Sequence, residues 1–452
     1  MLGRIGRAVA GLRGSWSEEL DERAIRRACV EAGHTWRDRK LDPVTTVRLF
    51  LLQILWGNAP CNHLPHLAGK DFTGAAYCEA RGRLPAAVLE ALLTRSTTRM
   101  AECVRETGRW LGHRLFLIDG STFSMPDEPA LRERFGQPAA QRVGCGFPTA
   151  HFLALVHFGS GLFQKVAVGS WRAHDLSNTP RLHPELEPDD VLLGDRAFCS
   201  YAHLAVLAGR GVHGLFRLHQ RIVADFTPGR PHAEPRGGKN ENKKGLPRSR
   251  WLARLGDEDQ LVEWFKPVDR PAWLSAADFA ALPATFRVRE LRYRVRRPGF
   301  RVRAVTLATT LRDAEAYPVA ALAEAYGLRW TIETSFAHLK TTMKLDVLRC
   351  QTPDGVLKEL TMFLLAYNLV RMTIWEAARR QGVEPERISF VDALRSLTAA
   401  RDDDERPRLV VLPRRPGRYE PRVRKRRPKS YKLLTRPRAV LREALRAQSL
   451  AP

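Results

Sequence analysis

Two short apolar runs that each end in an aspartate place the strongest constraint on the fold of this chain. The run RLFLIDGSTF reads as a buried strand from Leu115 to Ile118 that ends at Asp119 in a Gly-Ser turn. The run DDVLLGDRAFCSY repeats the pattern, with an apolar strand that leads into Asp195. Because α/β sheets usually place their sites at the carboxyl ends of strands, both acids are candidate site residues. Taken singly, Asp119 would be a turn residue and Asp195 a helix N-cap.

A run farther along the chain, YGLRWTIETSFAHLK, predicts a helix with one narrow polar stripe. Its four members lie at about 0°, 300°, 340° and 320° around the helix axis and are Tyr326, Arg329, Glu333 and Lys340. An apolar stripe runs beside it, formed by Leu328, Ile332, Phe336, Leu339 and Met343. A carboxylate in the company of two cations and a phenol suits the binding of a metal ion next to phosphates. The alternative is a surface ion pair between Arg329 and Glu333 on an ordinary amphipathic helix.

The spacing Tyr-x2-Arg-x3-Glu-x6-Lys resembles the YREK signature of bacterial insertion-sequence transposases of the DDE type. The resemblance implies that Asp119, Asp195 and Glu333 are the catalytic acids. The YREK spacing is specific, whereas the two strand-aspartate motifs are specific mainly in its company. Further segments are similar to the N-terminal and C-terminal regions of the family, namely Ala75 to Pro85, Leu365 to Ala378 and Pro421 to Tyr431.

The chemistry of such enzymes accounts for these residue types. Cleavage and strand transfer proceed by in-line attack on phosphorus, and two divalent cations roughly 3.5–4 Å apart stabilise both the attacking and the leaving oxygen. Because Mg²⁺ prefers carboxylate ligands, the resemblance implies that the three acids hold two Mg²⁺ ions, for which Mn²⁺ can substitute. It also implies a set of residues that grip phosphates near the cleaved DNA end: Tyr326, Arg329, Lys340 and, as a weaker candidate, Arg196.

Composition agrees with a nucleic-acid partner. The formal net charge of +25 indicates a polyanionic ligand. Arginine supplies most of the 74 basic residues, which favours forked contacts with phosphate, although a GC-rich genome alone would produce the same bias. A ribosomal or chromatin-like protein would share this charge but would not need the three acids. The seven cysteines are scattered without a CxxC pair, so they predict neither a disulfide framework nor a zinc site and indicate a reducing cytosol.

Breaks in composition divide the chain into five parts. We expect a helical region at 1–108, an α/β core in two pieces at 109–222 and 316–400, a β-strand insertion at 223–315 and a basic tail at 401–452. The resemblance implies an RNase H-like catalytic core that this insertion interrupts. It also assigns the N-terminal region to the binding of terminal inverted repeats, although the same helices can equally form a dimerisation or scaffold layer.

The insertion contains three runs with strand character, Gln260 to Lys266, Phe286 to Val295 and Phe300 to Thr310. The last two are expected to pair across Arg297-Pro298-Gly299. Alternating arginines predict a basic strand face that is either solvated or in contact with DNA, and these are Arg287, Arg289, Arg301 and Arg303. Some relatives excise through a DNA hairpin and keep a tryptophan in the strand before the YREK helix. The corresponding run here contains none, so a hairpin intermediate is a weaker inference than DDE chemistry.

Together these features predict a cut-and-paste DNA transposase whose partners are transposon-end DNA and target DNA. Synapsis of two ends implies a homodimer, through the resemblance. Two alternatives stay open, a non-catalytic arginine-rich DNA-binding regulator derived from a transposase and a metal-dependent nuclease that cuts without joining. The most apolar run, Val47 to Gly57, is too short to span a bilayer and carries Arg48, so we expect a cytoplasmic, nucleoid-associated bacterial protein.

Overall fold

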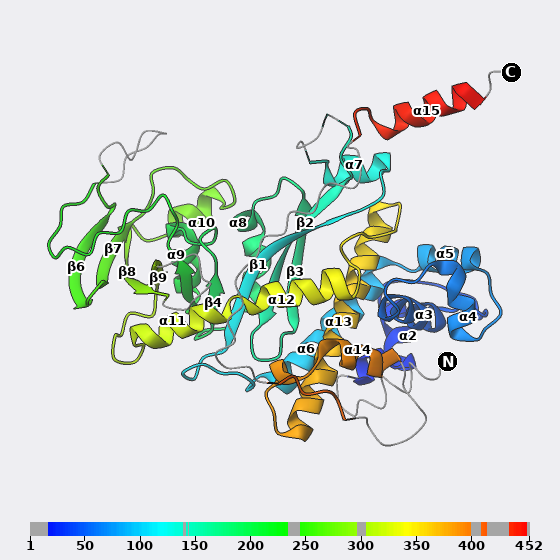
Figure 1. The fold of residues 1–452 in the computed structure, drawn as a ribbon, viewed down its shortest axis with the longest axis horizontal. Coiled ribbons are helices and arrows are strands. Elements are labelled where there is room, and N and C mark those ends of the chain that lie inside the picture. Colours follow the sequence, from blue (N-terminus) through cyan, green and yellow to red (C-terminus); the bar gives the residue numbers. More distant parts are fainter. Residues whose placement is uncertain are drawn as a thin grey trace.

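The computed structural model describes residues 17–138, 142, 144–233, 245–295, 304–398, 408–413 and 434–449. These residues form an α/β fold, as the sequence predicted, and helices cover both faces of one mixed sheet (Figure 1). The strand order across the sheet is β3-β2-β1-β4-β5-β9-β8-β7-β6. The strands are β1 (Leu115–Ser124), β2 (Thr149–His157), β3 (Phe163–Ser170), β4 (Val191–Gly194), β5 (His213–Arg217), β6 (Ser249–Gly256), β7 (Asp259–Phe265), β8 (Thr285–Arg294) and β9 (Ala304–Thr309).

The central strand β1 sends alternate side chains into two separate cores. Leu115 and Leu117 join the larger core, which α12 (Thr331–Ala337) and α13 (Pro353–Gln381) cover. Phe116 and Ile118 join the smaller core on the opposite face, which α9 (Tyr201–Gly209) covers. Because side chains of a strand alternate with a period of two, Asp119 belongs on the face of α12 and α13. The apolar alternation of β1 therefore decides which helices the acid meets.

The prediction that β1 stops at Asp119 in a turn is wrong. The strand continues through Ser124, and its antiparallel pairing with β2 includes Asp119 opposite Ala154 and Gly120 opposite Leu153. The turn signal in Gly-Ser is overridden because β2 supplies a partner along the whole length of β1. On its other edge, β1 pairs with β4 in parallel, and β4 does end at Gly194.

The strands predicted in the 223–315 region are confirmed within the described residues as β7, β8 and β9, while β6 was missed. They extend the central sheet, since β9 pairs antiparallel with β5. The predicted turn at 297–299 lies outside the described residues. So do two arginines of the predicted basic strand face, Arg301 and Arg303. Arg289 does not form part of a basic outer face, because its fully buried guanidinium makes two hydrogen bonds of 2.9 and 2.6 Å to the Asp259 carboxylate.

The predicted helical character of the N-terminal part is confirmed, and its helices lie on the right of Figure 1 against α13. Buried polar contacts join the two regions. Asn58 Nδ2 donates to Glu359 Oε1 at 2.6 Å, and Lys358 Nζ donates to the Gly82 carbonyl at 3.2 Å. The elements are η1 (Ser17–Leu20), α2 (Glu22–Glu31), α3 (Pro43–Leu55), η2 (Cys61–His63), α4 (Leu64–Ala68), α5 (Gly74–Arg83) and α6 (Ala86–Val104).

Helix α13 is the central support of the fold. Asn368 on this helix binds β3 through both the N–H and the carbonyl of Phe163, at 3.0 Å each, which fixes the helix across the sheet. No helix among the described ranges is long and apolar enough to cross a membrane. The remaining helices are α7 (Pro129–Phe135), α8 (Asp175–Asn178), η3 (Thr179–Arg181), η4 (His183–Glu185), α10 (Ala276–Ala281), α11 (Val319–Leu328), the π-helical turn η5 (His338–Thr342), η6 (Pro385–Arg387), α14 (Phe390–Thr398) and α15 (Arg438–Ser449).

Candidate active site

The parallel pair of β1 and β4 brings two of the predicted acids together. Leu117 is the register partner of Leu193. If this register is continued two residues beyond Leu117 and Leu193, it reaches Asp119 and Asp195. Neighbouring strands of a sheet are about 4.8 Å apart. Asp195 follows directly after the end of β4, where its Oδ1 accepts a hydrogen bond of 2.7 Å from the Ala197 N–H. Both acids therefore lie at the carboxyl end of the parallel pair.

The segment that carries the other candidates is not one continuous α-helix. Helix α11 ends at Leu328 and α12 begins at Thr331. Between them the backbone makes i to i−3 hydrogen bonds, such as Arg329 N–H to the Tyr326 carbonyl at 3.2 Å, which are typical of a tighter 3₁₀ turn. Gly327 weakens the helix at this point. The angles calculated for one continuous α-helix, at 100° per residue, therefore do not hold across this junction. Arg329 and Glu333 nevertheless remain one turn apart.

Arg329 lies between two of the three acids. Its Nη1 is 3.4 Å from Asp119 Oδ2, and its Nη2 is 3.6 Å from Glu333 Oε1. The side chain of Arg329 is only 9% exposed, whereas that of Glu333 is 50% exposed. Its Nε is buried and has no hydrogen-bond partner among the described residues. A buried guanidinium with a free N–H beside two carboxylates is the electrostatic centre of this site.

The remaining predicted residues lie at different places around this centre. Lys340 reaches β1 from the turn η5, with its Nζ 3.4 Å from Ser121 Oγ and 3.2 Å from Asp346 Oδ1. Tyr326 is buried, and burial raises the pKa of its phenol to about 12. Arg196 is exposed and donates to Gln220 Oε1 at 2.9 Å.

The carboxyl group of Asp119 is electrostatically unusual. Burial raises its pKa to about 6, and the nearby carboxylates of Asp195 and Asp175 raise it too. The Gly120 N–H, which donates to Asp119 Oδ1 at 2.8 Å, and the Arg329 guanidinium act in the opposite direction. The charged form of Asp119 is thus costly in the isolated protein, because a buried anion beside like charges lacks sufficient compensation. A cation bound here would supply that compensation.

A pair of side chains that the sequence did not single out packs on the other face of β1, behind Asp119. His151 Nε2 lies 2.9 Å from Asp175 Oδ1, and both groups approach the backbone at Gly120. A Cβ at position 120 would collide with this carboxylate and would lie 2.6 Å from His151 Nε2. Glycine is required here because the strand next to Asp119 is packed directly against the pair. The alternation of β2 could have indicated an inward His151, but nothing in the sequence pointed to Asp175.

Sequence reasoning also missed Trp330. Its side chain is 52% exposed, and the Arg329 guanidinium carbon lies 4.8 Å from the centre of its ring. The backbone carbonyl of Trp330 accepts the Glu333 N–H at 3.2 Å, so this ring is presented at the start of the turn that carries the acid. An exposed tryptophan beside a carboxylate and an arginine offers a stacking surface next to charged groups. The sequence feature that could have identified Trp330 was its position within the YREK run.

The chemistry of the donors fits a hard divalent cation. Carboxylate oxygens are the ligands that Mg²⁺ and Mn²⁺ prefer, and a positive group, Arg329, already lies between Asp119 and Glu333. Within the described residues, no three His, Cys, Asp or Glu side chains lie close enough to form a ready-made metal site. Glu333 is the most exposed of the three acids.

Comparison with known proteins identifies the class to which this chain belongs. Residues 110–369 match the family described as the transposase DDE domain, which is more than half of the chain. The chain belongs to this family and is a DNA transposase, which confirms the class that its sequence motifs indicated.

Its relatives are particular bacterial transposases. The chain is 25% identical over 445 residues to the transposase InsG for insertion sequence element IS4 of Escherichia coli strain K12, with 92% of this chain and 93% of that protein covered. It is 28% identical over 156 residues to the putative transposase InsZ of the same organism, with 34% and 52% covered. Among solved structures, the piggyBac transposase synaptic complex with hairpin DNA is similar, with a TM-score of 0.44, 8% identity, and 83% and 75% of the two chains covered.

Proposed function

We propose that this protein cleaves DNA at the ends of a transposable element and joins those ends to target DNA by a cut-and-paste reaction. Asp119, Asp195 and Glu333 are the acids of this proposal, and they hold two Mg²⁺ ions, or Mn²⁺ in their place. The observation that carries it is the position of Arg329 between Asp119 and Glu333, with Asp195 at the end of the strand beside β1. Asp119 and Glu333, which are distant in the chain, thus both contact Arg329.

The strand order supports an RNase H-like assignment for the core. Strands β3-β2-β1-β4-β5 form one block in which β2 is antiparallel to β1 while β4 and β5 run parallel to it. In this proposal, 109–222 and 316–400 form the catalytic core and 223–315 is the β-strand insertion. The helical region 1–108 binds the terminal inverted repeats, and the basic tail 401–452 adds non-specific affinity for DNA.

The side chains of the site have distinct proposed roles. Bound divalent ions would activate the attacking water or 3′-hydroxyl and stabilise the leaving oxygen. Arg329 holds a phosphate through the N–H groups that the acids leave free, and Lys340 contributes a point charge from the turn η5. Tyr326 keeps its phenol proton near neutral pH and is therefore a hydrogen-bond donor. Exposed Arg196 contacts the DNA backbone farther from the reacting phosphorus.

A strand-transfer experiment tests the function. Two DNA fragments from the sequences that flank this reading frame are incubated with the protein, Mg²⁺ and a supercoiled target plasmid. We expect cleaved ends and end-to-target joints, and both products should disappear with EDTA. Cleavage without joints would favour a nuclease that does not transfer strands, and binding without cleavage would favour a DNA-binding regulator.

We also propose that the protein acts as a homodimer, because two DNA ends must be held together. It would act in the bacterial cytoplasm, bound to the nucleoid.

The raised pKa of Asp119 gives a prediction about pH. Its pKa of about 6 lies above the ordinary 3.8, so the carboxyl group still holds its proton at pH 5 and a metal ion must displace that proton. We expect the affinity for Mn²⁺, measured by titration calorimetry, to rise about tenfold per pH unit up to pH 6 and then to level off. The variant Asp119→Asn should lose this dependence. An affinity in the wild type that is unchanged across this range would contradict the assignment.

A further inference from the structure

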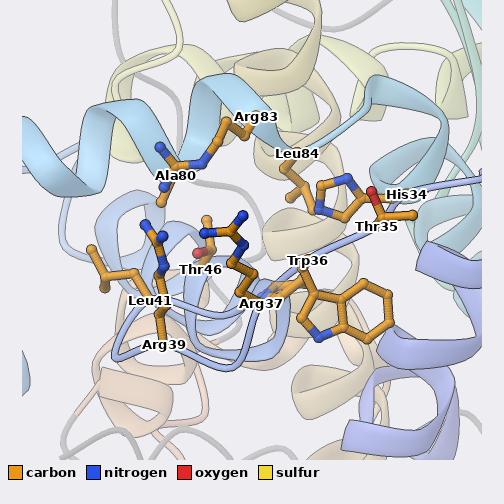
Figure 2. Close-up of a pocket in the computed structure, with 11 residues that line it drawn as sticks. His34, Thr35, Trp36, Arg37, Arg39, Leu41, Thr46, Ala80, Arg83 and Leu84 are labelled. Atoms are coloured by element: carbon orange, nitrogen blue, oxygen red, sulfur yellow. The ribbon is translucent and has the colours of Figure 1, made fainter.

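A cavity of about 440 Å³ lies in the N-terminal helical region, away from the three acids. It is enclosed by the segment 34–41, which joins α2 to α3, and by the C-terminal end of α5 (Figure 2). Its lining contains neither aspartate nor glutamate but includes three arginines, Arg37, Arg39 and Arg83. In Figure 2, Arg37 and Arg39 extend from the segment toward α5, while Trp36 and His34 lie to the right.

The positive charges of this cavity are poorly neutralised. Within the described residues, no carboxylate forms an ion pair with Arg37 or Arg39, and both side chains are exposed. Arg83 lies 3.5 Å from Glu79, one helical turn away on the solvent side of α5. Three neighbouring cations repel one another, and a bound anion would remove that repulsion.

The opposite wall of the cavity is aromatic. The rings of His34 and Trp36 are stacked, with centroids 5.9 Å apart and an angle of 23° between their planes. Burial, and then the charge of Arg83, lower the pKa of His34, so the imidazole is neutral at pH 7. A flat neutral surface beside a group of arginines matches a nucleic-acid backbone, in which an uncharged sugar accompanies each phosphate. A free phosphate ion would use only the arginines.

The cavity is connected to the catalytic part of the chain through α5. Two residues before Arg83, the half-buried Arg81 donates to Cys350 Sγ at 2.8 Å. Lys358 on α13 holds the carbonyl of Gly82. A ligand bound by Arg83 would therefore lie at a defined position relative to the segment that follows Lys340.

We propose that this cavity binds a backbone phosphate of duplex DNA through Arg37, Arg39 and Arg83, with the neighbouring deoxyribose against Trp36. The inference rests on the proposed function in that DNA is the ligand, and it names the contact point within the region assigned to end binding. Arginine suits this contact because its planar fork donates two N–H groups to one phosphate.

The double variant Arg37→Gln/Arg39→Gln tests the proposal. A labelled duplex from the DNA that flanks the reading frame is titrated with full-length protein at several salt concentrations, and binding is followed by anisotropy. We expect the variant to bind about tenfold more weakly or worse, since charge-assisted hydrogen bonds are lost. The slope of log affinity against log salt should fall by about one for each phosphate contact removed. The variant Arg37→Lys/Arg39→Lys should keep the slope but bind more weakly than wild type.

A matched control is the double variant Arg23→Gln/Lys70→Gln, which also removes two positive charges, from exposed positions outside the cavity. Equal affinity and equal salt slope for the control and the double cavity variant would overturn the proposal. The fold of each variant is checked by circular dichroism melting. We expect the double cavity variant to be folded, because both arginines are exposed. Unchanged DNA binding together with loss of stabilisation by inorganic phosphate would also overturn it, by assigning the cavity to a free anion.

The outcome is separable from that of the proposed function. The control variant outside the cavity should bind the duplex nearly as tightly as wild type, whereas the double cavity variant should bind weakly. If the wild type binds DNA but never cleaves it, the catalytic proposal fails while the cavity can still be assigned from binding alone. If cleavage is confirmed and the cavity variants bind normally, only the cavity proposal fails.

Discussion

Glutamine in place of Glu333 is expected to lower the rate of DNA end cleavage by about a thousandfold, because one ligand of a catalytic divalent ion is worth several kcal/mol of transition-state stabilisation. Glutamine keeps the size of the side chain and removes its charge. The glutamate is half exposed and its contact with Arg329 is 3.6 Å long, so the fold should tolerate the change. The measurement is single-turnover cleavage of a labelled end in Mg²⁺, with binding of the same DNA measured in parallel.

The matched control for this variant is Glu324→Gln. Glu324 is an exposed residue of α11, the helix that precedes α12, and the substitution removes the same charge. We expect the control to cleave at the wild-type rate. Wild-type cleavage by Glu333→Gln would contradict the assignment of this residue as an acid of the site. Loss of DNA binding together with cleavage would instead assign it a role in holding DNA.

The second large effect concerns stability. Methionine in place of Arg289 is expected to lower the free energy of unfolding by about 3–5 kcal/mol, because it leaves the Asp259 carboxylate buried without its partner. This carboxylate is 3% exposed, and the pair joins the neighbouring strands β7 and β8. The guanidinium also donates to the carbonyls of Asp313 at 3.2 Å and Tyr317 at 2.7 Å, which lie just before α11. The measurement is the shift of the urea unfolding transition.

Two controls accompany this variant. Arg287→Met changes an exposed arginine of the same strand and should cost less than about 0.5 kcal/mol. The double variant Arg289→Met/Asp259→Leu removes both charges and should be more stable than Arg289→Met alone, since no uncompensated charge is left. If Arg289→Met were no less stable than Arg287→Met, the buried pair would not hold the insertion to the core.

Several features of the site could be predicted from local sequence. Apolar runs of β-branched and aliphatic residues predicted the strands that lead to Asp119 and Asp195, and alternation along β1 explains why Asp119 faces α12. The i, i+4 spacing of Arg329 and Glu333 survives in the structure because a single turn separates them. These are short-range properties that depend on a few neighbouring residues.

Other features depend on partners that are distant in the chain. Arg289 was assigned to a solvated or DNA-binding face, since alternation distinguishes two faces of a strand but does not say which face is covered. The structure covers that face with Asp259 and the residues before α11. Likewise, the continuation of β1 past Asp119 was missed, because the Gly-Ser pair favours a turn only where no strand lies alongside.

The resemblance of its YREK spacing to a known family therefore indicated the class of this protein, and the order of polar and apolar residues predicted the strands that lead to its aspartates. Only the tertiary structure decided that Arg329 sits between Asp119 and Glu333, that Arg289 is buried, and that Arg37, Arg39 and Arg83 line one cavity. The physical reason is that spacing along a chain specifies local geometry, whereas burial and electrostatic pairing depend on which distant surfaces pack together.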